Sequence, residues 1–278
     1  MTFKRIVLIA LGGGVVGDVS GFVASIYMRG ISVVQIPTTL LAQVDSSVGG
    51  KTGVNHRVAK NMIGTFHQPS LVLSDSLLLK TLPDREHASG LYECLKYGVI
   101  RDTVLFEDFE KNVGMFLRRD PEAIERLVAK CAAIKADIVM ADEREGDLRR
   151  ILNFGHTVGH ALEAAAKYQR IKHGEAVGYG MIAAARISTS LRKLAEGERA
   201  RIEGAVGSIS RLPALNGVNS KAVLNALHHD KKVRDGAVHF ILPREVGNVE
   251  ITPDVPIAIL RDVVKGMLDE SKRISGPG

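Results

Sequence analysis

A glycine-rich turn near the N-terminus constrains the fold of this chain more than any other feature. Leu11 to Gly21 reads LGGGVVGDVSG and lies between a β-rich run and a helical stretch. Gly12, Gly14 and Gly17 have the spacing of dinucleotide-binding turns, in which bare backbone N–H groups at a helix N-terminus meet a pyrophosphate. A tight strand-to-helix turn without a ligand fits the same letters, and no acidic residue follows at about twenty positions to bind a ribose. Either reading predicts an α/β arrangement.

The pattern along the chain divides it into two parts. β-rich runs at 5–11, 31–37 and 71–74 alternate with glycine-rich or helical stretches, which predicts an α/β part over residues 1–75. From residue 76 the apolar positions recur every three or four residues, so 76–278 is predicted to be mainly α-helical. Near its end, the stretch VHFILPREVGNVEI is typical of a small β-hairpin.

Composition favours a globular protein of the cytoplasm. The 278 residues are 45% hydrophobic, enough for one large core or two modest ones. Cys94 and Cys131 lie far apart in apolar helical patterns, which predicts reduced, buried thiols. The apolar run at the N-terminus is too short for a signal peptide, and we expect no membrane-spanning segment.

The formal net charge of +6 raises the question of a nucleic-acid partner. Lys and Arg are spread along the chain, aromatic content is only 5%, and tryptophan is absent, so we expect no nucleic-acid binding. A basic pocket for a small, multiply anionic substrate explains the excess charge, and so does a solvated basic surface.

A histidine motif in the helical part indicates a metal site. The stretch NFGHTVGHALE places His156 and His160 one helical turn apart on one face, and HGE adds His173 and Glu175. Two histidines at this spacing are common in structural roles. Three histidines and a glutamate in glycine-punctuated, apolar surroundings favour zinc in a three-ligand catalytic site with one open position.

Cationic side chains also fall at positions where a solvated surface does not explain them. Residues 37–69 combine glycines and hydroxyls with Lys51 and Lys60 in a long segment of poor periodicity, which is typical of a binding loop for phosphate or carboxylate. Lys135 lies on the apolar stripe of its predicted helix, where it either extends to the surface or points into an anionic site. Glu93 and Lys96 are three apart on one helix, as a surface pair or as part of a polar pocket.

Seven motifs together resemble the 3-dehydroquinate synthases, in order and over most of the chain. They read GGGVVGDVSGFVA, PTTLLAQVDSSVGGKTGVNH, AKNMIGTFHQP, YECLKYG, LNFGHTVGHALE, HGEAV and HHDKKV. The resemblance implies that residues 1–75 are the remainder of an NAD-binding α/β domain and that 76–278 form a helical metal- and substrate-binding domain. It places the active site in the cleft between two such domains.

The resemblance also implies roles for individual residues. It makes the metal ligands Glu93, His156 and His173, and it turns His160 into a polar group that faces the substrate. The implied catalytic and substrate-binding set is Lys96, Lys135, Arg149, Asn153, His160, Asp45, Lys51, Lys60, Asn61, Arg29 and Lys231, with Lys232 as the alternative to Lys231. The implied NAD set is Gly14, Val15, Val16, Gly17, Asp18, Thr38, Thr39, Lys51, Lys60 and Thr81.

The implied reaction converts 3-deoxy-D-arabino-heptulosonate 7-phosphate to 3-dehydroquinate and phosphate in the shikimate pathway. NAD accepts a hydride and later returns it, a divalent ion such as zinc or cobalt binds the vicinal hydroxyls, phosphate is eliminated, and an aldol reaction closes the ring. The family also implies a homodimer in which Arg29 contacts phosphate across the subunits.

The chain differs from the family in one respect, and three alternative functions remain open. Family members carry a further α/β segment before the glycine turn, so we expect this chain to be N-terminally truncated, with the adenosine half of the NAD site in the missing segment. The alternatives are another sugar-phosphate cyclase, a metal-dependent alcohol or glycerol dehydrogenase, and an inactive truncated fragment. Four residues match the pattern of the 3-dehydroquinate synthases better than that of the other cyclases: Asn153, His160, Lys60 and Asn61.

Overall fold

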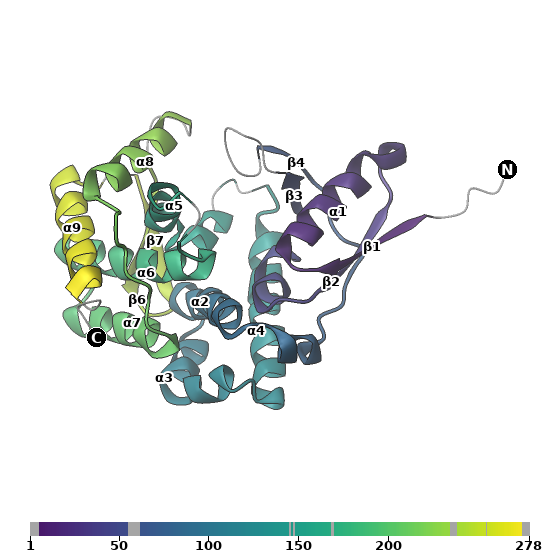
Figure 1. Cartoon of the computed structure of the whole chain (residues 1–278), viewed down its shortest axis with the longest axis horizontal. Coiled ribbons are helices and arrows are strands. Elements are labelled where there is room, and N and C mark those ends of the chain that lie inside the picture. The colour runs from purple at the N-terminus through teal and green to yellow at the C-terminus, as the bar shows by residue number, and fades with distance from the viewer. Residues whose placement is uncertain are drawn as a thin grey trace. The chain divides into compact units, whose positions relative to one another are not determined.

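The computed structural model describes residues 6–54, 62–144, 146, 148–167, 170–233, 238–253 and 255–273 (Figure 1), with the backbone alone at 229–233. The chain forms two compact units, each assembled from two stretches. Unit 1 comprises Met1–Cys94 and Gly114–Glu145, and unit 2 comprises Leu95–Val113 and Gly146–Gly278. Helices α2 (Asp84–Ile100) and α3 (Thr103–Leu117) contribute to both units. The predicted boundary at residue 75 stays a prediction.

A parallel sheet organises the N-terminal part of unit 1. Its strands are β1 (Val7–Gly12), β2 (Ser32–Pro37) and β5 (Leu71–Val72), in the order β1-β2-β5. These are the three runs predicted from the sequence, and α1 (Gly14–Ile26) connects the first two. The predicted α/β character of this part is therefore confirmed.

Glycines let α1 lie close to its neighbours in unit 1. A Cβ at Gly17 would lie 2.6 Å from Oε1 of Gln35 on β2, and one at Gly21 would lie 2.4 Å from Cγ2 of Thr52. Thr52 belongs to β3 (Lys51–Val54), which pairs antiparallel with β4 (Ile63–Phe66). The sequence pattern of 37–69 did not indicate this hairpin.

The remaining elements of unit 1 are one long helix and three short helical turns. They are α4 (Pro121–Ala141), the 3-10 turns η1 (Tyr27–Arg29) and η3 (Ser76–Thr81), and the π-helical turn η2 (Ala42–Ser46). The predicted apolar stripe of α4 is buried, and Lys135, which lies on that stripe, is only 6% exposed. Helical phase alone therefore located a buried lysine.

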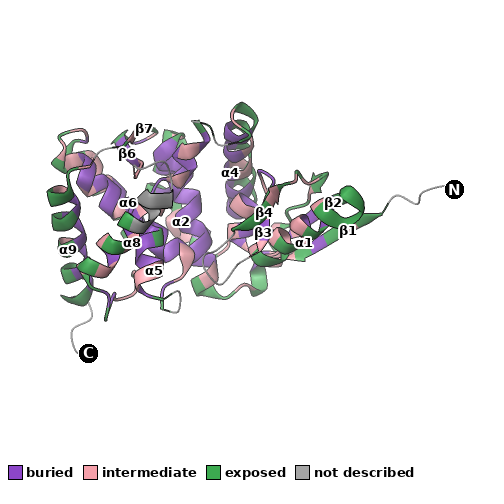
Figure 2. Ribbon diagram, turned by 90° about the horizontal axis from the view of Figure 1, so that it is seen from above, coloured by how far each residue is buried: buried purple, intermediate pink, exposed green. Residues whose placement is uncertain are grey.

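Unit 2 is mainly helical, as predicted. Besides the end of α2 and most of α3 it contains η4 (Leu148–Asn153), α5 (His156–Ala165), α6 (His173–Ser190), α7 (Glu196–Ile209), α8 (Ser220–Val233) and α9 (Ile257–Arg273). The predicted hairpin is β6 (Phe240–Glu245) and β7 (Asn248–Thr252). Helix α6 buries 13 of its 18 residues, so it forms the centre of this unit (Figure 2).

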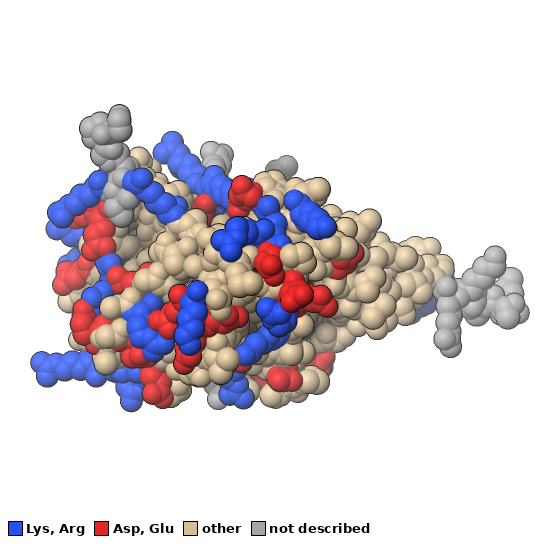
Figure 3. All heavy atoms as spheres, turned by 90° about the horizontal axis from the view of Figure 1, so that it is seen from below, with Lys and Arg blue, Asp and Glu red and all other residues tan. Residues whose placement is uncertain are grey.

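The distribution of surface charge and the burial of the two cysteines match what the sequence predicted. On the face drawn in Figure 3, Lys and Arg are interspersed with Asp and Glu and do not gather into one basic patch. Cys94 and Cys131 are both buried and free, as predicted. Among the described residues, no helix is both long and apolar enough to cross a bilayer.

Candidate active site

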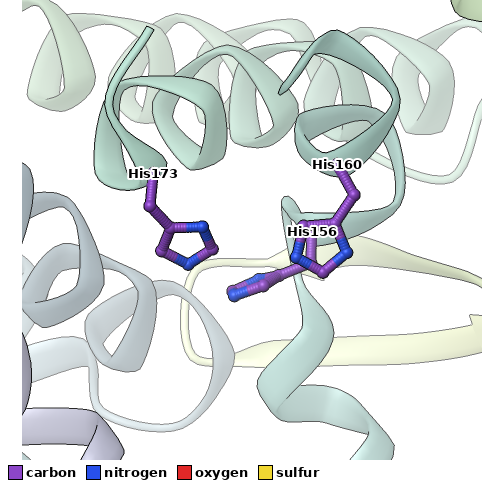
Figure 4. Close-up of side chains that lie close together, drawn as sticks. All are labelled: His156, His160 and His173. Carbon is purple, nitrogen blue, oxygen red and sulfur yellow. The ribbon is translucent and has the colours of Figure 1, made fainter. Parts of the chain in front are cut away.

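Three histidines converge in unit 2. His156 and His160 lie on α5, and His173 is the first residue of α6 (Figure 4). The ring centroids are 5.3 Å apart for His156 and His160, 5.2 Å for His156 and His173, and 5.8 Å for His160 and His173. One nitrogen from each ring lies within 4.8 Å of the others, so all three can approach a single ion.

Close packing of α5 on α6 creates this convergence. A Cβ at Gly180 would lie 1.7 Å from the carbonyl oxygen of Gly155, and one at Gly159 would lie 2.9 Å from that of Ala176. Gly155 itself has φ +78, a conformation that favours glycine, at the position that caps α5. The helices meet backbone to backbone, and this brings the imidazoles of both helices to one place.

An oxygen atom lies beside Nδ1 of two of the three imidazoles. Nδ1 of His156 donates a hydrogen bond to the carbonyl of Phe154 (3.0 Å), which leaves Nε2 with its lone pair. Nδ1 of His173 lies 3.5 Å from Oε2 of Glu163, a buried carboxylate on α5. Both histidines are half-buried, whereas His160 is exposed. The donor set suits a divalent ion such as Zn²⁺ or Co²⁺.

Buried cations accompany the histidines in unit 2. Lys96 on α2 is 1% exposed, and its Nζ lies 5.0 Å from the centroid of the Tyr97 ring. Arg149 on η4 is 2% exposed, and Asn153 at the end of the same turn is half-buried. A cation fixed in surroundings of low polarity interacts strongly with an anion that reaches it, so these positions suit the binding of an anion.

A second charged cluster lies in unit 1. Nζ of Lys135 on α4 forms an ion pair with Oδ1 of Asp45 on η2 (2.9 Å) and also donates to the Asp45 carbonyl. The lysine side chain is 8% exposed and the aspartate side chain 26%. The structure therefore joins two residues that the resemblance placed in the substrate-binding set.

Asp18 on α1 belongs to the same electrostatic cluster. The pKa of its carboxyl is raised to about 6, chiefly by burial and in smaller part by the negative charge of Asp45, while the positive charge of Lys135 opposes the rise. A carboxyl with this pKa exchanges its proton near neutral pH, so it can act as donor or acceptor. Asp18 was predicted in the NAD set, and the structure links it to residues of the substrate set.

The glycine turn presents the N-terminus of α1. Gly13 caps the helix without a side-chain hydrogen bond, and a Cβ at Gly14 would lie 3.1 Å from Oγ of Ser46. The backbone N–H of Thr38 donates to the Gly12 carbonyl, which ties the turn to the end of β2. Val15, in the first turn of α1, is 74% exposed. Backbone donors here suit an anionic ligand group.

The other predicted site residues occupy varied positions. Glu93 is fully buried on α2 in unit 1. Exposed positions are taken by Arg29 on η1, Lys51 on β3 and Thr81 at the end of η3, while Val16 is 42% exposed and Thr39 half-buried. Lys60 and Asn61 lie outside the described residues, as does the side chain of Lys231 on α8.

Glu163 lies beside the three histidines, and the sequence predicted no role for it. It lies seven positions after His156 and three after His160, so all three share one face of α5. This helical phase was the available signal. The contact of Glu163 with His173 on the next helix could not be predicted from sequence spacing alone.

Comparison with known proteins identifies relatives of both parts of the chain. Residues 2–89 match the family described as 3-dehydroquinate synthase N-terminal, and residues 90–233 match 3-dehydroquinate synthase C-terminal. A 3-dehydroquinate synthase of Koribacter versatilis is 53% identical over 252 residues, which cover 91% of this chain and 69% of the relative.

Two solved structures have the same fold. A 2-epi-5-epi-valiolone synthase from Streptomyces hygroscopicus subsp. jinggangensis, with NAD⁺ and Zn²⁺ bound, matches with a TM-score of 0.86 and 32% identity over 94% of this chain and 73% of the other. A 2-deoxy-scyllo-inosose synthase complexed with carbaglucose-6-phosphate, NAD⁺ and Co²⁺ matches with a TM-score of 0.83 and 27% identity, covering 95% and 75%. By its two family matches and its identity to the Koribacter enzyme, this chain belongs to the 3-dehydroquinate synthase family.

Proposed function

We propose that this protein is a 3-dehydroquinate synthase, a lyase that converts 3-deoxy-D-arabino-heptulosonate 7-phosphate to 3-dehydroquinate and inorganic phosphate. The observation that carries the proposal is the 53% identity, over 91% of the chain, to a relative of that activity. The related cyclases of solved structure are less similar, at 32% and 27% identity. The reaction places the protein in the shikimate pathway.

The proposed cofactors are NAD and one divalent metal ion, zinc or cobalt. When bound, NAD supplies a reversible hydride acceptor and the metal a Lewis acid. For the metal we propose Glu93, His156 and His173 as ligands, with His160 directed to the substrate. The Nδ1 hydrogen bond of His156 supports its part in this set, because it leaves Nε2 for coordination.

For NAD we propose the first turn of α1 together with hydroxyl and lysine side chains around it. The exposed backbone donors after Gly13 favour a phosphate group there. The proposed residues are Gly14, Val15, Val16, Gly17, Asp18, Thr38, Thr39, Lys51, Lys60 and Thr81. Asp18, with its pKa near 6, can hold or release a proton toward a cofactor hydroxyl.

The substrate is multiply anionic, and the proposed binding residues are largely cationic. Lys96, Lys135 and Arg149 are each less than 10% exposed, so an anionic ligand that reaches them interacts through a medium of low polarity. Such fixed cations stabilise negative charge that develops as the phosphate leaves and as the enolate attacks in ring closure. Asn153 and His160 offer neutral polar contacts. The remaining proposed contacts are Asp45, Lys51, Lys60, Asn61, Arg29 and Lys231.

We also propose a cytoplasmic homodimer. Two free, buried cysteines suit a reducing compartment. In unit 1, Arg29 is exposed with φ 66, next to Tyr27 and Met28, which are 50% and 58% exposed. An exposed apolar pair beside an arginine suits a surface that a second subunit covers, with Arg29 then directed to the partner's substrate phosphate.

Phosphate release tests the activity. The purified protein is incubated with NAD, Zn²⁺ or Co²⁺ and 3-deoxy-D-arabino-heptulosonate 7-phosphate, and inorganic phosphate and NADH absorbance are followed together. We expect phosphate release without net NADH. Turnover of glucose 6-phosphate or sedoheptulose 7-phosphate instead would assign a different cyclase activity, and accumulation of NADH with an alcohol would assign a dehydrogenase. No turnover of any of these substrates would leave an inactive chain.

A further inference from the structure

A buried carboxylate stands behind one of the proposed metal ligands. Glu163 on α5 is 5% exposed, and its Oε2 lies 3.5 Å from Nδ1 of His173 on α6. Helical phase puts it on the same face of α5 as His156 and His160. It therefore belongs to the surroundings of the histidine cluster without being one of the residues whose donor atoms converge there.

An imidazole binds a metal through one nitrogen, and the hydrogen bond of the other nitrogen decides which one is free. A carboxylate at Nδ1 keeps the proton there, orients the ring and makes Nε2 more basic. His156 has the equivalent arrangement, with the Phe154 carbonyl at its Nδ1 (3.0 Å). The two half-buried histidines of the cluster are thus both approached at Nδ1 by an oxygen.

We propose that Glu163 is a positioning residue that holds His173 as the Nδ1–H tautomer with Nε2 directed to the metal. The proposal rests on the metal site of the proposed function and assigns a role to a residue outside its ligand set. A negative charge at this place also offsets part of the charge of a divalent ion bound by neutral imidazoles. A merely structural pair between α5 and α6 requires neither this tautomer nor any effect on the metal.

The tautomer of His173 is measured directly by ¹⁵N NMR of the imidazoles in the metal-free protein. We expect the Nδ1–H form in the unmodified protein, and a shift toward the Nε2–H form, which free imidazole favours, in Glu163→Leu. Glu163→Gln retains an oxygen that can accept from Nδ1 and should largely keep the tautomer. Glu203→Gln, which removes a carboxylate that pairs with Arg186 and Arg199 elsewhere in unit 2, is the matched control and should change nothing.

Metal affinity is measured on the same proteins by competition with a chromogenic Zn²⁺ chelator. We expect Glu163→Leu to bind Zn²⁺ about 10- to 100-fold more weakly and Glu163→Gln less than about tenfold more weakly. An unchanged tautomer together with affinity within about twofold in Glu163→Leu would overturn the proposal; if that variant does not fold, Glu163→Ala is read by the same criterion. If the unmodified protein binds no Zn²⁺, the proposed metal site fails, and the NMR result still decides the role of Glu163.

Discussion

The two units build their candidate clusters in different ways. In unit 2, the three histidines come from two consecutive helices, and close backbone packing fixes their spacing. In unit 1, Asp18, Asp45 and Lys135 come from three separate elements, and the paired residues Asp45 and Lys135 are 90 positions apart. The first cluster depends on shape, and the second on charges that compensate one another. Substitutions should therefore disturb the histidine cluster mainly through packing and the cluster of Asp18, Asp45 and Lys135 mainly through electrostatics.

The outer surfaces of the two units differ as well. In unit 1, β1 and α1 expose Ile9 (63%), Leu11 (61%) and Val15 (74%), and within the described residues β1 pairs only with β2. In unit 2, α6 is buried along most of its length (Figure 2). An exposed apolar edge strand tends to pair with another strand or to be covered by another protein surface, whereas a buried helix does not. We therefore expect binding of a further strand or protein surface to change the stability of unit 1 more than that of unit 2.

The largest effect is expected where α5 and α6 touch. Gly180→Ala places a methyl group where the Gly155 carbonyl lies, and neither backbone can yield without moving a helix. We expect a loss of at least about 3 kcal/mol in the free energy of unfolding, or failure to fold, because overpacking against backbone is relieved only by displacement. Urea unfolding followed by circular dichroism measures this.

A glycine elsewhere in unit 2 provides the control. A methyl group added at Gly204 on α7 would meet no atom within 4 Å, so Gly204→Ala should stabilise the protein by roughly 0.5–1 kcal/mol. Equal behaviour of the two variants would contradict the claim that shape governs unit 2.

Removal of the proposed metal ligands should have the next largest effect, which is on metal affinity. We expect His156→Ala, His173→Ala and Glu93→Gln each to lose bound metal, by about 100-fold in affinity or more, and His160→Ala to retain it. Elemental analysis of the purified variants measures this. Loss of metal in His160→Ala as complete as in His156→Ala would replace the proposed set by one in which all three histidines bind the ion.

Lys135→Met tests how much the ion pair with Asp45 contributes to the stability of unit 1. It leaves Asp45 without its ion-pair partner, and we expect a loss of about 1–2 kcal/mol, below the value for a fully buried pair because the Asp45 side chain is 26% exposed. Turnover should fall by about one to two decades if the ammonium also contacts substrate. The control is Arg126→Met on the same helix, whose pair with Glu122 is exposed and should matter by less than about 0.5 kcal/mol.

The smallest expected effect is the pH-dependent contribution of Asp18 to the free energy of unfolding. Its folded-state pKa is raised to about 6, so the folded protein binds this proton more tightly than the unfolded chain does. Its contribution to stability is therefore present below about pH 4 and is lost as pH rises to about 6. Asp18→Asn should stabilise the protein at pH 7.5 by roughly 1 kcal/mol, after allowance for solvent screening at a half-buried carboxyl, and not at pH 4. Equal gains at both pH values would assign the effect to something other than ionisation.

The sequence predicted the local parts of the site better than the distant ones. Helical spacing placed His156 and His160 on one face, and it placed Lys135 on a buried stripe, because both depend only on the period of one helix. The ion pair of Lys135 with Asp45 and the contact of Glu163 with His173 join different elements, so no periodicity could indicate them. The β3–β4 hairpin was missed because its short strands lie in a glycine-rich segment without clear alternation.

The contact of Gly155 with Gly180 also bears on how distant relatives of this helix pair are recognised. A metal ligand can change to another donor and still bind an ion, since imidazole, thiolate and carboxylate all serve. The side chain of Gly180 is a single hydrogen atom, and every other residue would add a Cβ. Position 180 therefore cannot change to another residue while the helices cross at this distance. In a diverged sequence the two glycines are therefore a more durable signature of this arrangement than the histidines they bring together.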